Sequence, residues 1–344
     1  MRMVAERAGV SESTVSRILA GQRQYDPATV RRVQAAAEAL RFRPNSLVRG
    51  ILSGRTGAIG VVVPASTPFL AGILHGIHDA LSEADQALLL AWNPLHYASP
   101  RNRSELRHIH RLLEYRVDGI ILRPTHDDAR HEEFREIWDR GLPLVVVDRE
   151  LPGVRCDFAG TDDTTGGRLA AEHLLKLGHR RLGHLAGPRS VSTARGRRSG
   201  FEEAVSSWGA GASCRTVEAP HFSGTRKEAL ILLRARPRPT AVFCVNDDAA
   251  ADLYAAAAEL GLDIPRDVSV VGFADLPLAS WLRPALTTLR QDPYRLGREA
   301  VRIVLERRDG PPRPAGPIEV RLKPDLVARK STAPPLPGRG RKAP

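Results

Sequence analysis

The chain has 344 residues, of which 26% are charged, and a formal net charge of +12. Because this length exceeds one ordinary hydrophobic core, we expect two or three domains. No run of eighteen or more apolar residues occurs, and the first residues lack the apolar core of a secretory signal, so we expect a cytoplasmic protein without a membrane span. Cys156, Cys214 and Cys244 lack the CxxC spacing that would indicate zinc or a disulfide framework.

The positive charge is concentrated at the two ends of the chain. The first 55 residues hold ten Arg and four acidic residues, whereas the residues from Arg329 onward hold five Lys or Arg and no acid. The long segment between them is close to neutral. A polyanion such as DNA is therefore expected to bind at an end of the chain.

The segment Val4–Ala20 predicts two short helices separated by a turn at Gly9. Apolar residues recur at helical spacing on both sides of Gly9, and glycine tolerates the left-handed backbone that such a turn needs. Ser11 is a favourable N-cap for the second helix. A polar front on an apolar back suits insertion into a DNA major groove, although a helical hairpin with a solvated face would give the same pattern.

Asp26 and Pro27 begin a predicted third helix. Three stretches, AGVSESTVSRIL, FRPNSLVRG and SGRTGAIGVVVP, together resemble the LacI/GalR family of bacterial transcription regulators. The resemblance continues to Arg329 and so covers nearly the whole chain. It implies a sequence-specific DNA-binding regulator, usually a repressor, whose operator affinity is controlled by a small-molecule effector such as a sugar. One departure is Met3, which stands where family members usually have an Asp, so we expect either an upstream start or an uncapped first helix.

Beyond residue 57, apolar runs alternate with helical patterns, which predicts parallel sheets covered by helices on both faces. The expected fold class is α/β, with a three-helix helix-turn-helix head and a hinge helix before a two-lobed core similar to periplasmic binding proteins. The expected divisions are a head at 1–44, a hinge helix and linker at 45–57, a first lobe at 58–157 plus 289–317, a second lobe at 158–288 plus 318–330, and a disordered basic tail at 331–344. Strands are expected at 58–63, 87–92, 119–123, 144–148, 181–187, 240–245 and 268–273, and helices near 71–84, 104–115, 132–140, 164–177, 194–207, 224–234, 249–260 and 296–306.

The second helix supplies the candidate DNA contacts. Arg17 is the best candidate for a base contact, because a guanidinium can bind both acceptors on a guanine edge. Glu12 and Ser13 occupy positions that vary with operator sequence in the resembled family, although Glu12 also suits the helix dipole alone. Phosphate contacts, which set register rather than sequence, are expected from Ser11, Thr14 and Ser16.

The segment Asn45–Leu52 resembles the family's hinge helix, which by resemblance folds on operator DNA and pairs with its twin. Asn45 begins this DNA-contacting segment, and the position that pushes an apolar side chain into the minor groove falls on Ile51. Gly50 weakens such a helix by about 1 kcal/mol relative to Ala, which fits a segment that orders only on DNA. A plain linker would have the same composition.

Effectors of open α/β sheets bind at the carboxyl ends of the strands, so we expect a cleft there, between the lobes. Arg197 falls where the resembled family places a ligand-binding arginine, whose planar fork can hold two hydroxyls or a carboxylate. Each candidate side chain has capping or lobe bridging as an alternative role. The candidate effector ligands are Phe69, Arg123, Asp148, Arg197, Phe222, Asn246 and Asp275.

The end of the strand VSVVGF departs from the family pattern. Relatives usually carry Asp-Asp after this strand, whereas here Ala274 precedes Asp275. The ligand-facing acid is therefore missing, and Arg123 and Arg197 near a cleft make an acidic effector, such as a sugar phosphate, an option. An effector-independent DNA-binding protein with a decayed pocket is the alternative reading.

The sequence predicts no catalytic residues, no metal site and no cofactor, because P-loop, GxGxxG, HExxH and GxSxG motifs are all missing. The Pro- and Gly-rich end has no leucine heptad, so a homodimer rather than a tetramer is expected. The dimer is expected to read a pseudo-palindromic operator. The helix Phe69–Ala84, with its apolar stripe, is the candidate dimer surface, although such a stripe is often simply core.

Overall fold

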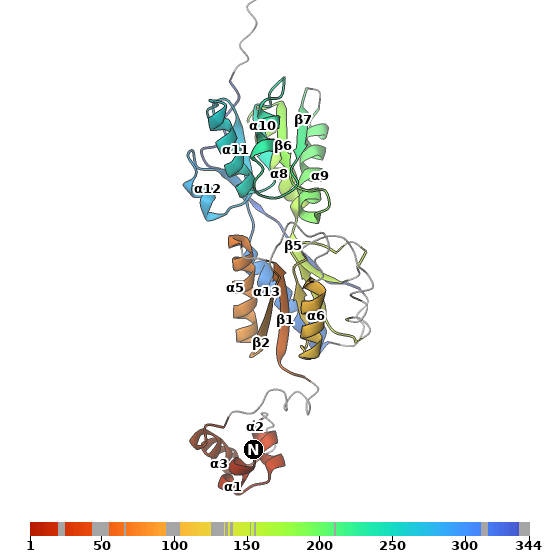
Figure 1. The fold of residues 1–344 in the computed structure, drawn as a ribbon, viewed down its shortest axis with the longest axis vertical. Helices are drawn as coiled ribbons and strands as arrows, with labels where there is room; N and C mark the ends of the chain where they lie inside the picture. Colours follow the sequence, from red (N-terminus) through yellow and green to blue (C-terminus); the bar gives the residue numbers. More distant parts are fainter. Residues whose placement is uncertain are drawn as a thin grey trace, which may run out of the picture.

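The structure, a computed structural model, describes residues 1–19, 25–42, 55–64, 67–93, 104–124, 134, 137, 140–151, 153–154, 156–209, 211–310 and 316–336. Figure 1 shows a helical head followed by two lobes, each built on a sheet. The expected α/β class with a helix-turn-helix head is confirmed. The predicted hinge, with Asn45 and Ile51, lies outside the described residues, and so does most of the helix expected at 132–140.

The head contains the helices α1 (Arg2–Ala8), α2 (Glu12–Leu19) and α3 (Pro27–Ala39). Its small core is made by apolar residues of all three helices, among them Val4, Val15 and Val33, which are almost fully buried. Asp26 caps α3 by accepting a hydrogen bond from the Thr29 amide at 3.3 Å. The periodicity and capping signals of the sequence therefore locate all three helices correctly.

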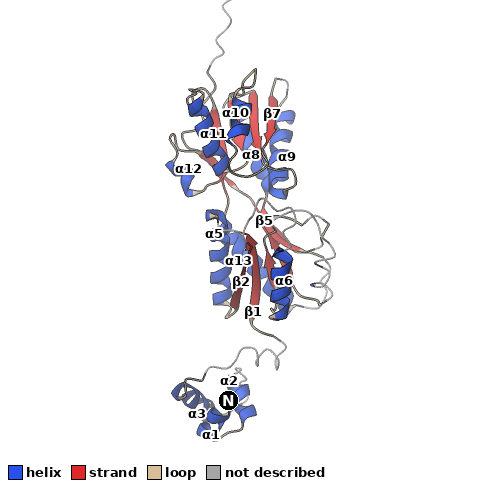
Figure 2. Cartoon of the chain, viewed as in Figure 1, coloured by secondary structure: helices blue, strands red, loops and turns tan. Residues whose placement is uncertain are grey.

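The first lobe is a six-stranded parallel sheet in the order β11-β5-β4-β3-β1-β2. Its strands are β1 (Ala58–Pro64), β2 (Ala87–Asn93), β3 (Ile120–Leu122), β4 (Leu144–Val147), β5 (Asp157–Thr161) and β11 (Glu319–Leu322). Val61 and Val63 pack toward α5 (Pro68–Glu83) and α13 (Pro293–Asp309), whereas Val62 packs toward α6 (Ser104–Glu114) on the other face. Figure 2 shows these layers. Burial on both faces explains why β1, β3 and β4, which lie inside the sheet, are continuous apolar runs.

The second lobe is also six-stranded, in the order β12-β10-β9-β8-β6-β7, with only β12 antiparallel to its neighbour among these strands. Its strands are β6 (Arg181–Ala186), β7 (Ser213–Glu218), β8 (Ala241–Cys244), β9 (Ser269–Ala274), β10 (Thr287–Arg290) and β12 (Asp325–Val327). The helices are α8 (Asp163–Lys176), α9 (Ser192–Ser207), α10 (Arg226–Leu233), α11 (Asp247–Glu259) and α12 (Pro277–Trp281). α8 and α9 cover one face, and α10 and α11 cover the other.

The predicted boundaries between the lobes are wrong at two strands. We expected Phe158 and the strand at 318–322 in the second lobe, but β5 and β11 pair with each other in the first sheet. Within the described residues the chain therefore passes between the lobes three times, after β5, β10 and β11. Gln291 Nε2 donates to Thr161 Oγ1 at 2.7 Å, and the Asp162 amide donates to the Leu322 carbonyl at 2.9 Å, so the three crossings are joined side by side.

The expectation of a disordered tail from residue 331 is wrong for residues 331–336. Ser331 is fully buried, and its hydroxyl accepts from the Thr287 amide at 2.7 Å and donates to the Val270 carbonyl at 2.6 Å. The Ala333 carbonyl accepts from His179 Nε2 at 2.9 Å. Short polar side chains thus fix this Pro-rich segment to the second sheet. Residues 337–344 lie outside the described residues.

The candidate dimer helix α5 turns most of its apolar stripe inward. Leu70, Ile73, Ile77 and Leu81 are at most 3% exposed and belong to the core of the first lobe, whereas Leu74 is half-buried. The stripe is therefore core, and it packs against α13. None of the helices in the described ranges is long and apolar enough to cross a membrane.

Candidate DNA-binding and effector sites

The turn of the head has the geometry that the sequence predicts. Gly9 ends α1 in the left-handed conformation, with φ 65° and ψ 40°. The Ser11 hydroxyl accepts a hydrogen bond from the Thr14 amide at 3.1 Å, as an N-cap does. The same hydroxyl lies 2.8 Å from the hydroxyls of Ser13 and Thr14. This arrangement fixes the angle at which α2 leaves the turn.

The outer surface of α2 is polar and accessible. Val15 and Ile18 are buried in the head core, so the residues between them face outward. Such a surface, carried by a short capped helix, fits the recognition helix of a helix-turn-helix unit. The structure places the predicted DNA contacts on this helix and its cap, with Ser11, Glu12, Ser13 and Arg17 exposed and Thr14 and Ser16 half-buried. Their contacts with DNA stay predictions.

Two predicted effector residues form a buried ion pair at the carboxyl ends of neighbouring strands. Arg123 follows β3 and Asp148 follows β4, and both are less than 10% exposed. Arg123 Nε and Nη2 each lie 3.0 Å from Asp148 Oδ2. Asp148 has a φ of 68°, which is uncommon for a residue other than glycine. The pair is thus held in a defined position at the edge of the first lobe.

The next two residues of the first lobe reach the second lobe. The Arg149 guanidinium lies over the Phe222 ring, 5.2 Å from its centroid, and the Glu150 amide donates to the Ser192 hydroxyl at 3.0 Å. Ser192 begins α9, and Phe222 follows β7. Phe222, which we predicted as an apolar face for a ligand, is therefore part of a contact between the lobes.

Arg197 lies on α9 and is 5% exposed. Its Nε lies 2.7 Å from Asp163 Oδ1, its Nη1 donates to the Val245 carbonyl at 2.8 Å, and its guanidinium stacks 3.8 Å from the centroid of the Phe273 ring. Burial raises the pKa of Asp163, and the adjacent positive charge of Arg197 opposes that rise. Sequence reasoning missed Asp163; the available signal was a pair of acids, Asp162 and Asp163, directly between a strand and a helix.

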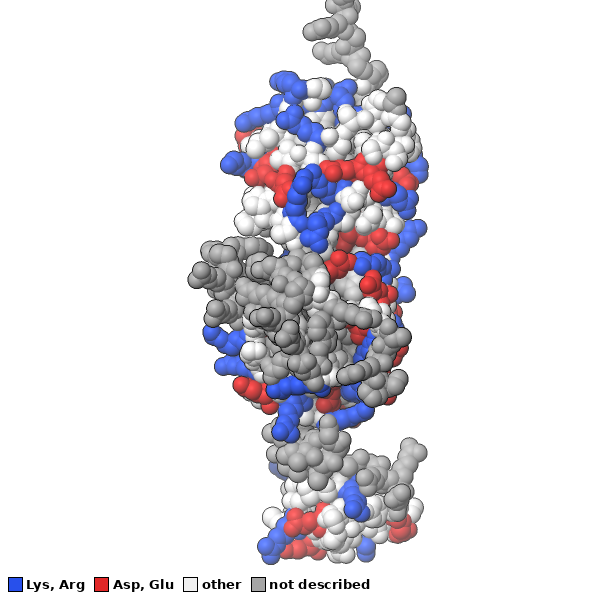
Figure 3. Space-filling view, turned by 90° about the vertical axis from the view of Figure 1, so that its right-hand side faces the viewer, with Lys and Arg blue, Asp and Glu red and all other residues white. Residues whose placement is uncertain are grey.

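A cavity of about 260 Å³ lies between the lobes. Asp148 and Phe158 line it from the first lobe, and Ser192 and Ser199 of α9 line it from the second. The other lining residues are Glu150, Asp162, Asp163, Thr164, Arg195, Gly196 and Arg321. Figure 3 shows acidic and basic side chains mixed on the face of the molecule near the boundary between the lobes. The cavity thus offers hydroxyl and carboxylate acceptors beside arginine donors, with one aromatic ring.

The remaining predicted effector residues have partners within their own lobes. Asn246 caps α11 by accepting from the Ala249 amide at 2.8 Å, and Phe69 is half-buried against the core of the first lobe. Asp275 Oδ2 and Oδ1 lie 2.7 and 2.6 Å from guanidinium nitrogens of Arg290 and Arg329. The structure therefore does not bring these three to the cavity that Asp148 lines, and Arg123, Arg197 and Phe222 are not among its lining residues either.

Asp247 is a further buried acid at the end of a second-lobe strand. It accepts hydrogen bonds from the Thr288 hydroxyl at 2.6 Å and the Leu276 amide at 2.7 Å, and burial raises its pKa to about 6. It joins the ends of β8, β9 and β10 and has a structural role. Among the described residues, no cluster of three or more His, Cys, Asp or Glu has a metal-binding arrangement.

Comparison with known proteins assigns the chain to one family. Residues 1–45 match the model of bacterial regulatory proteins of the lacI family, and residues 171–332 match a periplasmic binding protein-like domain. The transcriptional repressor PurR of Photobacterium profundum is 31% identical over 333 residues, 95% of this chain and 97% of the relative. The ribose operon repressor of Escherichia coli is 31% identical over 312 residues, 89% and 92% of the two chains.

A solved structure of the lac repressor dimer, bound to operator and the anti-inducer ONPF, superposes with a TM-score of 0.82. It is 26% identical and covers 96% of this chain and 98% of that one. The chain therefore belongs to the lacI family of bacterial regulatory proteins. This confirms the resemblance seen in the sequence and, with it, the class of function: a DNA-binding transcription regulator with an effector domain.

Proposed function

We propose that the chain is a homodimeric, cytoplasmic repressor that binds a pseudo-palindromic operator, and that a small neutral effector bound between the lobes changes its operator affinity. The observation that carries the proposal is the combination of an exposed recognition surface on α2 with a cavity between two lobes. Two relatives are named as repressors, and the superposed lac repressor is a dimer on operator DNA.

The electrostatics of the cavity support a neutral, hydroxyl-rich effector rather than an acidic one. The cavity is lined by four acids, Asp148, Glu150, Asp162 and Asp163, and by two arginines, Arg195 and Arg321, of which Arg321 lies 2.6 Å from Glu150. An anionic effector would be repelled by the acidic lining, or would have to displace Glu150 from Arg321. A sugar would instead share the existing donors and acceptors and pack a face on Phe158.

The coupling follows from the way the lobes are connected. Effector in the cavity contacts both lobes, so it favours one relative position of the two. The first lobe continues through Arg55 into the predicted hinge, and two hinges of a dimer pair only at one spacing. The expected change in operator affinity is about 1–3 kcal/mol, a typical coupling free energy. The alternative, a regulator with a decayed pocket, predicts no change.

The DNA part of the proposal is tested by selecting duplexes from a random pool with the intact chain and measuring affinity at physiological salt. Arg17→Ala should lose about 1–3 kcal/mol on the selected duplex and less on random DNA. Arg31→Ala, which removes the same charge from the exposed surface of α3, is the matched control and should preserve the preference. Equal losses for Arg17→Ala on both duplexes would show that Arg17 contacts only phosphate.

The effector part is tested by titrating neutral sugars and their phosphates into the chain by calorimetry. A neutral sugar should bind and raise the melting temperature, because a ligand of the folded state stabilises it by mass action. The same sugar should then change affinity for the selected duplex. Tighter binding of the phosphates would refute the neutral effector, and binding of neither class would favour the decayed pocket. A bound sugar without effect on duplex affinity would refute the coupling.

A further inference from the structure

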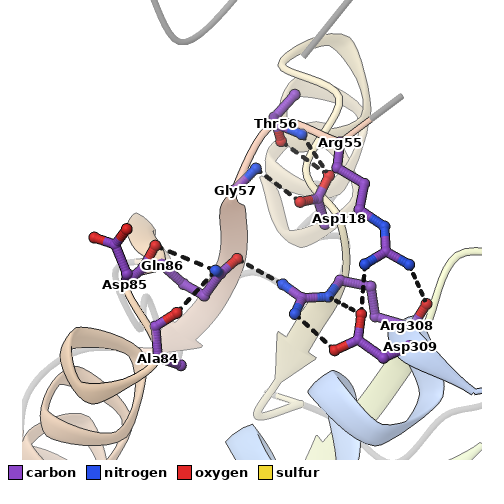
Figure 4. Close-up of polar contacts among 9 residues, drawn as sticks. All are labelled: Arg55, Thr56, Gly57, Ala84, Asp85, Gln86, Asp118, Arg308 and Asp309. Atoms are coloured by element: carbon purple, nitrogen blue, oxygen red, sulfur yellow. Dashed lines mark hydrogen bonds and ion pairs between the residues drawn. The ribbon is translucent and has the colours of Figure 1, made fainter. Parts of the chain in front are cut away.

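The structure describes the chain again from Arg55, in the linker that follows the predicted hinge helix. Arg55, Thr56 and Gly57 lead into β1 at the end of the first lobe that is joined to the head through residues 43–54. Figure 4 shows that these three residues are bound by side chains from distant parts of the chain. We call Arg55–Gly57 the hinge exit.

Asp118 binds the hinge exit with both carboxylate oxygens. It lies between α6 and β3, and its backbone amide donates to the Ala58 carbonyl at 2.7 Å. Its Oδ1 accepts from the Thr56 amide at 2.8 Å and the Thr56 hydroxyl at 3.1 Å, and its Oδ2 accepts from the Gly57 amide at 2.8 Å. One side chain therefore satisfies two successive backbone amides, and charge-assisted bonds of this kind are stronger than neutral ones.

Arg55 extends the attachment to α13 and α5. Its Nη1 lies 2.6 Å from Asp309 Oδ1, and its Nη2 donates to the Arg308 carbonyl at 3.2 Å. Asp309 also binds Arg308 through both carboxylate oxygens, at 3.0 and 2.8 Å, and Arg308 Nη1 donates to Gln86 Oε1 at 2.6 Å. Gln86 in turn donates to the Ala84 and Asp85 carbonyls just after α5 (Figure 4). The hinge exit is thus joined to the ends of two packed helices.

We propose that Asp118 and Asp309 are positioning residues that fix the hinge exit to the first lobe. A movement of this lobe then moves the hinge by the same amount. The inference rests on the proposed function and names the residues that transmit its regulation. Three released residues span up to about 10 Å at roughly 3.3–3.6 Å each. A linker with that freedom absorbs a lobe movement instead of passing it on.

The test compares Asp118→Ala, Asp118→Asn and Asp309→Asn with a matched control, Glu83→Gln. Glu83 lies on α5 of the same lobe, but it pairs with Arg298 and does not contact the hinge exit. Replacing it with Gln removes one negative charge, as each of the three Asp substitutions does. For all four variants we measure the affinity for sugar and the affinity for duplex with and without sugar. The duplex is the one selected by the intact chain, and the sugar is the neutral one that most raises the melting temperature of the intact chain.

The expected result separates binding from coupling. Sugar affinity should stay within about twofold of the unaltered chain in every variant, because none of the substituted residues lines the cavity between the lobes. The fold-change in duplex affinity caused by the sugar should fall most in Asp118→Ala, less in Asp118→Asn, which keeps one acceptor oxygen, and not in Glu83→Gln. Hydrogen exchange at the Thr56 and Gly57 amides should be faster in Asp118→Ala.

A full sugar response in Asp118→Ala, together with fast exchange at those amides, would overturn the positioning role. Unchanged hydrogen exchange at the Thr56 and Gly57 amides in Asp118→Ala would show that Asp118 does not hold the hinge exit. If the unaltered chain selects no duplex or shows no sugar response, the proposed function fails instead, and the exchange rates still decide whether Asp118 holds the hinge exit. Unfolding curves of the Asn variants identify any loss that is due to misfolding.

Discussion

Replacing Arg197 with Met removes the positive charge that faces buried Asp163 while keeping a side chain of similar length. Removing one partner of a buried pair costs about 3–5 kcal/mol when the other charge stays ionised. Burial already raises the pKa of Asp163, and loss of Arg197 raises it further. A group with a raised folded-state pKa stabilises the fold below that pKa and loses this contribution as the pH rises through it. The penalty in Arg197→Met should therefore be large at pH 8 and smaller at pH 5.

Urea unfolding at the two pH values measures this difference. At pH 8, about one unit above the folded-state pKa of about 7 of Asp163, we expect a loss that exceeds the loss at pH 5 by up to about 1.4 kcal/mol. At pH 5, where Asp163 is protonated, we expect about 1–2 kcal/mol for the lost hydrogen bond to Val245 and the stacking on Phe273. The double variant with Asp163→Asn should recover much of the loss at pH 8. Arg298→Met, at the exposed pair with Glu83, is the control and should show no pH-dependent loss. An equal loss at both pH values in Arg197→Met would refute the reasoning.

Three further predictions concern buried groups. Burial raises the pKa of Asp247 to about 6, so between pH 4 and pH 6 the folded chain retains a proton that the unfolded chain releases. The unaltered chain therefore loses stability as the pH rises. In urea titrations, the difference in free energy of unfolding between it and Asp247→Asn should shrink by up to about 3 kcal/mol from pH 4 to pH 7. For His184 the pH dependence has the opposite sign, because burial lowers its pKa to about 4. Relative to His184→Leu, the free energy of unfolding of the unaltered chain should fall by up to about 3 kcal/mol as the pH falls from 6.5 to 4. In Gly76→Ala, the new methyl group would collide with the Tyr294 carbonyl on α13, so the melting temperature should fall by an amount equivalent to about 1–3 kcal/mol, whereas exposed Ser82→Ala on the same helix should not change it. A constant Asp247→Asn deficit, an acid-independent His184→Leu difference or an unchanged Gly76→Ala midpoint would contradict the respective prediction.

The sequence predicts most of the elements because their signals are local. Gly9 and Ser11 mark the turn of the head, and each apolar run beyond residue 57 becomes a strand, which is buried in every case except the edge strand β2. The lobe assignment of β5 and β11 was wrong because it is not a local property. Their sequences, DFAGT and EVRL, are short and mixed, and pairing partners at long range decide which sheet they join.

The cleft was predictable only in part, for the same reason. Arg123 and Asp148 follow adjacent parallel strands, so their proximity follows from topology. The pairing of Arg197 with Asp163 depends instead on how closely α8 and α9 approach. Gly167 lies against the Arg197 carbonyl, where a Cβ would not fit. No sequence period reveals that approach, so the partner of Arg197 emerged only from the packing of the two helices.

The three passages between the lobes also set the order in which the molecule can be completed during synthesis. The first sheet needs β11, and its helical cover needs α13, yet both come from residues 293–322, after almost all of the second lobe has been made. The head, by contrast, needs only residues near the start of the chain. A chain released early from the ribosome therefore has a complete head, but its effector domain lacks the last strand and the covering helix of the first sheet.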